Sequence, residues 1–68
     1  MLTVLRIGDK LKETRKRRLL TQEQLADKAG VGINTITRIE RNQVEPQGRT
    51  IRKLAQALDV PPSYLLED

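Results

Sequence analysis

Residues 22–41, QEQLADKAGVGINTITRIER, decide the fold of this chain because they predict two short helices joined by a sharp turn. The first helix has small or apolar residues one and four positions apart, which share one face: Leu25, Ala26 and Ala29. In the second helix Ile36 and Ile39 are three positions apart and form the inner face. Gly30 lies between the helices and can adopt positive φ without a Cβ clash, as a sharp turn requires. The stretch therefore predicts a closely packed helical pair.

Polar residues mark where each of the two helices begins. Thr21 lies one residue before the first helix, and Gln24 follows three residues later, which is the spacing of a capping box. Gly32 is the expected N-cap of the second helix, although it lacks the side-chain oxygen of Ser or Thr. The pattern predicts a helix-turn-helix over about residues 21–41, with its second helix over about residues 33–41.

This pair resembles the helix-turn-helix of the phage-repressor, Cro and Xre-type family. The matching segments, at the family's spacing, are Leu20-Thr21-Gln22, Leu25-Ala26, Ala29-Gly30-Val31, Ile36, Ile39-Glu40-Arg41 and Pro46. The likeness covers about residues 6–66. It implies an all-α fold, a compact five-helix lambda-repressor-like helix-turn-helix domain. In that family the second helix of the pair enters the major groove of DNA.

Three further helices are expected to complete this single domain of residues 1–68. A first helix over about residues 7–18 has an inner stripe of Ile7, Leu11 and Thr14, and Leu19 and Leu20 are expected to follow it into the core. A fourth helix is expected over about residues 49–58, and its core-facing residues are Ile51, Leu54, Ala55 and Leu58. Pro62 is favoured at the first position of a last short helix, whose Leu65 is expected to close the core. Residues 1–5 form an apolar lead that is either a frayed end or a strap over the core.

Some helix ends depart from the family pattern. Leu19 and Asp59 stand where glycine, or another residue that tolerates positive φ, is usual. For Leu19 two outcomes are open: either the first helix ends without a left-handed cap, or Leu19 is strained. Gln47 and Gly48 replace the small polar cap and Leu that typically follow Pro46. The start of the fourth helix is therefore expected to be looser or shifted.

Composition excludes several classes of function. The 68 residues contain no cysteine and no histidine, which excludes disulfides and the usual zinc sites and argues against imidazole or thiolate catalysis. No metal, cofactor or small-molecule ligand is evident, and an enzyme is the weakest interpretation. No apolar run approaches the ~20 residues of a membrane span, and the first residues are too soon charged for a secretory signal. The protein is expected to stay in the cytoplasm without a membrane partner.

The outer stripe of the second helix in the pair is the expected DNA-reading surface. Its polar positions recur at i, i+3, i+4 and i+7: Asn34, Thr37, Arg38 and Arg41. Asn34 is expected to pair with adenine and Arg38 with guanine, each through two hydrogen bonds. Ile33 and Thr37 are expected to pack on thymine methyl groups. The alternative is an ordinary solvated polar face.

Other residues are expected to hold DNA phosphates. This set consists of Arg15, Gln22, Arg41, Asn42 and Arg49, with Gln22, Asn42 and Arg49 assigned by the family resemblance. For the basic run 15–18 the alternative is a favourable interaction with the negative end of a helix dipole, worth ~0.3–1 kcal/mol per cation.

Two structural contacts are also expected. Arg15 and Glu40 lie at the edges of two inward faces, and family members with this pattern typically pair them. The alternative is a solvated pair worth ~0–1 kcal/mol. Pro61, Tyr64 and Leu66 offer a self-complementary patch for a homodimer, unless they close the open end of the core.

Together these features predict a sequence-specific regulator of transcription that binds double-stranded DNA. The favoured form is a repressor that acts as a homodimer on a near-palindromic operator. Thirteen Lys and Arg against nine Asp and Glu leave a net charge of +4, which suits a polyanionic partner. The alternative is a protein-interaction module, such as an antitoxin or adaptor, whose main partner is another protein.

Overall fold

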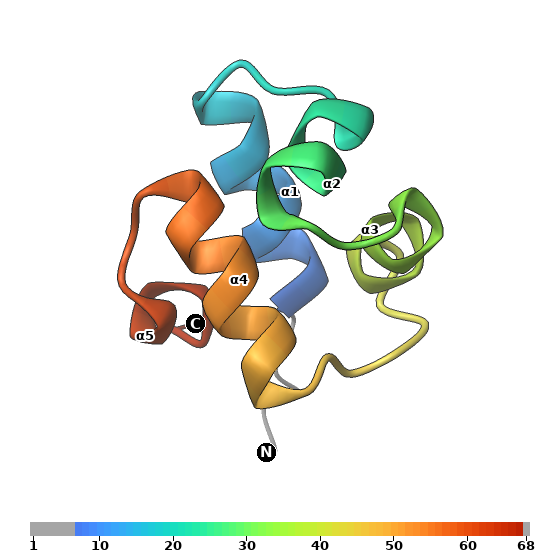
Figure 1. Ribbon diagram of the computed structural model, residues 1–68. Coiled ribbons are helices and arrows are strands. Elements are labelled where there is room, and N and C mark those ends of the chain that lie inside the picture. The colour runs from blue at the N-terminus through green and yellow to red at the C-terminus, as the bar shows by residue number, and fades with distance from the viewer. Residues whose placement is uncertain (1–6, 68) are drawn as a thin grey trace.

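The computed structural model describes residues 7–67, so the expected lead of residues 1–5 lies outside the described residues. Within this range the chain forms five α-helices and no strand (Figure 1). The helices are α1 Ile7–Arg17, α2 Gln22–Ala29, α3 Ile33–Glu40, α4 Gly48–Leu58 and α5 Pro62–Leu65. The all-α class and the order of five helices confirm the expectation from the sequence.

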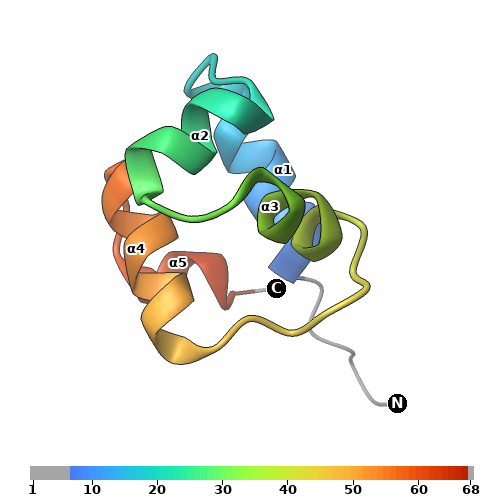
Figure 2. The same cartoon turned by 45° about the vertical axis from the view of Figure 1, so that its right-hand side comes forward.

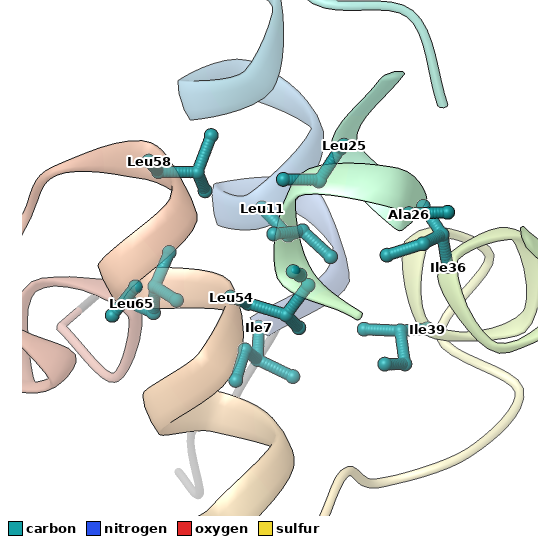
Figure 3. Packing of buried hydrophobic residues seen from close by; sticks show 11 residues of the cluster. Ile7, Leu11, Leu25, Ala26, Ile36, Ile39, Leu54, Leu58 and Leu65 are labelled. Carbon is teal, nitrogen blue, oxygen red and sulfur yellow. The ribbon is translucent and has the colours of Figure 1, made fainter. Parts of the chain in front are cut away.

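The helices surround one apolar core. α1 packs against α3 and α5, α2 packs against α3 and α4, and α4 packs against α5. Figure 3 shows side chains from all five helices converging between them. The large side chains that are fully buried are Leu11, Leu25, Ile36, Ile39, Leu54, Leu58 and Leu65. Leu65 therefore closes the core as expected, and α3 is anchored by two isoleucines on one face only.

Each of the first four helices is followed by a residue in the left-handed conformation. These residues are Leu19, Gly30, Asn42 and Asp59, with φ between 59° and 71°. In each case the backbone N–H of the residue that follows donates a hydrogen bond to the carbonyl oxygen five residues before it. The donor–acceptor pairs are Leu20 to Arg15, Val31 to Ala26, Gln43 to Arg38 and Val60 to Ala55. This hydrogen bond defines a Schellman cap, so four helices end by the same backbone device.

The end of α1 shows which of the two open outcomes for Leu19 holds. Leu19 has φ of 60°, so the left-handed cap forms and a β-carbon occupies a conformation that favours glycine. The side chain is 88% exposed, so the expectation that Leu19 follows α1 into the core is wrong. The capping turn reverses the chain before Leu20, and it is Leu20 that packs against the core.

Helix boundaries lie within one residue of the sequence prediction. α1 ends at Arg17, one residue early, and α3 ends at Glu40 with Arg41 as its C-cap. α4 begins at Gly48, which shifts its start by one residue toward the N-terminus. The capping box of α2 is present, because Gln24 N donates to Thr21 Oγ1 (3.0 Å) and Thr21 N donates to Gln24 Oε1 (2.9 Å).

Candidate nucleic-acid interface

The outer face of α3 is the candidate interface, because this helix lies at the edge of the molecule (Figures 1 and 2). Ile36 and Ile39 on its inner face are 0% and 1% exposed. On the opposite side the side chains of Ile33, Asn34 and Arg38 are exposed, and Thr37 is half-buried. α3 therefore presents an amide, a guanidinium and an apolar side chain together on an uncovered surface.

An ion pair between α1 and α3 supports this face from behind. Arg15 Nε donates to Glu40 Oε2 at 2.7 Å, and Nη2 donates to Oε1 at 3.0 Å, so the guanidinium grips the carboxylate with two parallel bonds. Arg15 and Glu40 are only 8% and 7% exposed. Arg15 Nη1 also donates to the Leu20 carbonyl oxygen at 2.8 Å. The pair expected from the sequence is thus bidentate, and it also holds the turn after α1.

The network continues from Glu40 into α2 and back to α3. Gln22 Nε2 donates to Glu40 Oε1 at 3.0 Å. Gln22 Oε1 lies 3.2 Å from the hydroxyl of Thr37, which is also 3.1 Å from the Ile33 carbonyl oxygen. A hydroxyl has one proton, so Thr37 donates to one of these two acceptors at a time. Through this chain of bonds, residues of α1, α2 and α3 fix one another.

This network bears on two of the expected phosphate ligands. Arg15 is buried and already donates three hydrogen bonds inside the protein. Gln22 is half-buried, and both polar atoms of its side-chain amide have partners within the domain. Both residues therefore brace α3 from within the domain, and their expected contacts to phosphate stay predictions.

Asn42 is also engaged within the domain. Its left-handed backbone ends α3, and its Oδ1 accepts a bond from Gly8 N at 3.1 Å, in the first turn of α1. Its Nδ2 donates to Asp9 Oδ1 at 3.1 Å. An N–H group near a helix start lacks an intrahelical partner, so Asn42 caps α1 from a distant part of the chain.

Gly8 permits this contact, and the sequence prediction did not single it out. A β-carbon on Gly8 would overlap the Ile39 carbonyl oxygen and would lie 2.6 Å from Asn42 Oδ1. The available signal was a glycine inside a helical pattern, which costs ~1 kcal/mol relative to alanine and usually has a packing reason.

Three expected phosphate ligands are exposed, namely Asn42 and two arginines. Arg41 is exposed at the C-cap of α3, and Arg49 is exposed in the first turn of α4. They flank the α3–α4 connection, so one cation lies at the end of α3 and the other at the start of α4. Their contacts to phosphate stay predictions.

The expected dimer residues are divided between surface and core. Pro61 and Leu66 are exposed. Tyr64 is half-buried against the core, and Lys10 Nζ lies 4.5 Å from the centroid of its ring. A cation at this distance over an aromatic face is a favourable contact. Tyr64 therefore helps to join α5 to α1, and its expected part in a dimer stays a prediction.

Within residues 7–67, no cluster of three or more acidic side chains is placed to hold a metal ion. None of the helices in that range has the length and apolar character needed to cross a membrane.

Comparison with known proteins gives consistent matches. Residues 11–65 match the model of a helix-turn-helix family. SinR of Bacillus subtilis, solved in complex with DNA, is 37% identical, with a TM-score of 0.86 over 90% of this chain and 98% of that one. The C2 repressor of Salmonella phage P22, solved with a synthetic operator, is 34% identical, with a TM-score of 0.84 over 96% of this chain and 97% of that one.

Curated relatives give the same result over a shorter share of their length. The transcriptional regulator ImmR of Bacillus subtilis is 35% identical over 60 residues, which are 88% of this chain and 47% of ImmR. The chain spans about half the length of the curated relatives it matches, with 47%, 52% and 42% covered in the first three.

Proposed function

This chain belongs to the helix-turn-helix family, and from that premise we propose that it is a sequence-specific regulator of transcription, a repressor, that binds double-stranded DNA. The mechanism is binding alone, and no enzymatic step is involved. Its relatives SinR and the P22 C2 repressor, both solved with DNA, support this proposal. A DNA target also agrees with the cytoplasmic location expected from the sequence.

The observation that carries the proposal is the asymmetry of α3. One face is buried and tied to α1 and α2 through Glu40 and Gln22, while the other exposes Asn34 and Arg38. The major groove of B-DNA is about 12 Å wide and admits one α-helix. A helix that is already held in place loses little conformational freedom on binding, so more of its contact energy remains for discrimination.

Each exposed residue of α3 has a proposed part in recognition. Asn34 would pair with adenine and Arg38 with guanine, because each side chain can form two hydrogen bonds to those base edges. Ile33 and the methyl group of Thr37 would pack on thymine methyl groups. Arg41 and Arg49 would contact phosphates, which position the protein without selecting a sequence.

A single helix-turn-helix contacts few bases, so one copy competes poorly against the many non-specific sites of a genome. We therefore propose a homodimer on a near-palindromic operator, with half-sites about one helical turn, ~34 Å, apart.

Selection of bound sequences from random duplexes tests the proposal. The expected result is enrichment of one near-palindromic motif whose half-sites are spaced by about one turn, ~10 base pairs. A pool that stays random after repeated rounds would contradict the proposal. That result would favour the alternative of a module whose main partner is another protein.

A further inference from the structure

Thr37 belongs both to the outer stripe of α3 and to the hydrogen-bond network that ties α3 to α1 and α2. The residue is half-buried, and its hydroxyl oxygen lies 3.2 Å from Gln22 Oε1 and 3.1 Å from the Ile33 carbonyl oxygen. A hydroxyl that rotates freely can either donate to a base or accept from one, so on its own it selects weakly among bases. The two neighbours of Thr37 remove that freedom.

The ion pair inside the domain fixes the orientation of the Gln22 amide. Both oxygens of Glu40 accept from the Arg15 guanidinium, at 2.7 and 3.0 Å, so this group is a carboxylate with no proton to donate. The end of the Gln22 amide that faces Glu40 at 3.0 Å must therefore be its NH2 group. The opposite end, Oε1, is an acceptor, and it is this end that faces Thr37.

The hydroxyl proton of Thr37 is therefore held inside the protein. Gln22 Oε1 and the Ile33 carbonyl oxygen can each accept it, and neither has a proton to donate in return. Among the hydrogen bonds of residues 7–67, the one that reaches Gln22 Oε1 comes from Thr37. If the proton pointed toward DNA, this oxygen of a half-buried residue would lose its donor, which is unfavourable. The hydroxyl oxygen thus offers only its lone pairs to a partner outside the domain.

We propose that Thr37 is a specificity-determining residue that acts toward DNA only as a hydrogen-bond acceptor, and that it selects the N6 amino group of an adenine. In the major groove the donors are adenine N6 and cytosine N4, whereas guanine O6, guanine N7 and thymine O4 are acceptors. A hydroxyl without a free proton is repelled by those acceptors. The methyl group of Thr37 favours adenine over cytosine, because an A·T pair carries a thymine methyl group and a G·C pair does not.

This inference rests on the proposed function and deepens it, because it adds a hydrogen bond of fixed direction to the thymine-methyl contact proposed for Thr37. It also gives the Arg15–Glu40 pair a part in recognition. The carboxylate of Glu40 orients the Gln22 amide, and that amide in turn accepts the Thr37 proton.

Selection from random duplexes with the native chain and with Thr37→Val locates the base that Thr37 contacts. The substitution keeps the shape and a methyl group of the side chain and removes its hydroxyl. The operator position at which the two chains differ most is assigned to Thr37. There the preference of the native chain for adenine should exceed that of the variant by about three- to tenfold. Thr35→Val is the matched control, because Thr35 lies on α3 outside the outer stripe, and it should retain the native motif at every position.

Base analogues at that position of the selected duplex then test the direction of the bond. 2-Aminopurine pairs with thymine but carries its amino group in the minor groove, so it should weaken binding of the native chain about three- to tenfold and leave Thr37→Val unaffected. 7-Deazaadenine keeps the N6 amino group and lacks the N7 acceptor, so the ratio of native to Thr37→Val affinity should stay as it is on adenine. A hydroxyl that donated its proton to N7 would give the reverse result. Fluorescence anisotropy measures each affinity.

Folding of each variant is checked by circular dichroism, and Thr37→Ala replaces Thr37→Val if the latter does not fold. The inference is overturned if the hydroxyl-free variant retains the native motif, if a base other than adenine is preferred at the assigned position, or if 2-aminopurine binds the native chain as adenine does. A native chain that selects no motif at all would overturn the proposed function and this inference with it, so the two failures are distinguishable.

Discussion

At the scale of single residues, the contact between Arg15 and Glu40 is a bidentate ion pair that is buried in the domain. Both side chains are removed from water, at 10% and 3% relative exposure, and each charge compensates the other. Removing one partner of a buried pair is costly because the remaining charge stays desolvated and unpaired. The same chain offers a matched exposed pair, Arg17–Glu13, at 64% and 54% relative exposure and 3.0 Å.

Glu40→Gln is expected to lower the free energy of unfolding by about 1–3 kcal/mol, because Arg15 is left under-satisfied. A double-mutant cycle on Arg15 and Glu40 in urea unfolding should show strong coupling. The same cycle on Arg17 and Glu13 should give only about 0.3–0.5 kcal/mol. Equal coupling in the two cycles would show that burial adds nothing to the Arg15–Glu40 pair.

Leu19→Gly is expected to raise stability by about 0.5–1 kcal/mol. The native residue has φ of 60° and a side chain that is 88% exposed, so glycine relieves backbone strain and removes little packing. Part of the gain is offset by the greater freedom of glycine in the unfolded chain. Thermal unfolding measures the change. Lys16→Gly, inside α1, should change stability by about 1 kcal/mol in the opposite direction. A lower melting temperature for Leu19→Gly would argue against strain at that residue.

At the scale of helices, the close approach of α1 and α3 depends on Gly8. Its N–H is bound by Asn42, and the space for a β-carbon is taken by the Ile39 carbonyl oxygen. This contact joins the first turn of α1 to the last turn of α3. The orientation of α3 therefore depends on a glycine far from its outer face.

Gly8→Ala is expected to destabilise the domain by about 1–3 kcal/mol, since backbone atoms must separate to admit the methyl group. Gly48→Ala is the matched control, because nothing lies within 4 Å of its added β-carbon at the start of α4. That control should be neutral or stabilising by up to about 1 kcal/mol. Urea unfolding of both variants checks the contrast, and a neutral Gly8→Ala would contradict the close packing of α1 on α3.

Helix positions were predictable to within a residue because local signals mark them. The Thr21–Gln24 capping box and the apolar spacing of Ile36 and Ile39 depend only on neighbours in the chain. Leu19 was not predictable in the same way. Leucine disfavours the left-handed conformation. In the structure Leu19 adopts that conformation nevertheless, and Leu20 packs against the core.

The candidate site was predictable in part. The outer stripe of α3 follows from helical periodicity, so the exposure of Asn34 and Arg38 was predictable from their spacing alone. The roles of Gln22 and Asn42 depend on partners 18 and 34 residues away in the chain, and no local pattern reveals such partners. The bonds of Gln22 and Asn42 within the domain therefore could not be predicted from the sequence, and their contacts to phosphate stay predictions.

At the scale of the whole molecule, the net charge of +4 and the exposed cations near α3 predict an affinity for DNA that depends strongly on salt. If a dimer neutralises ~6–10 phosphates, affinity should fall about 10³–10⁵-fold between 50 and 200 mM salt. Fluorescence anisotropy with a labelled duplex measures this slope. An almost flat response would count against DNA as the partner.

The central claim is that the outer face of α3 reads the base sequence. Its most direct test compares binding to the selected duplex and to a shuffled duplex at physiological salt, for the native chain and for the Asn34→Ala/Arg38→Ala double variant. The native chain should prefer the selected duplex by about 10³-fold or more. The double variant should lose most of that preference, about 1–3 kcal/mol per bidentate contact, while its binding to the shuffled duplex changes little. A double variant that keeps the native preference, or that loses affinity for both duplexes equally, would contradict the claim.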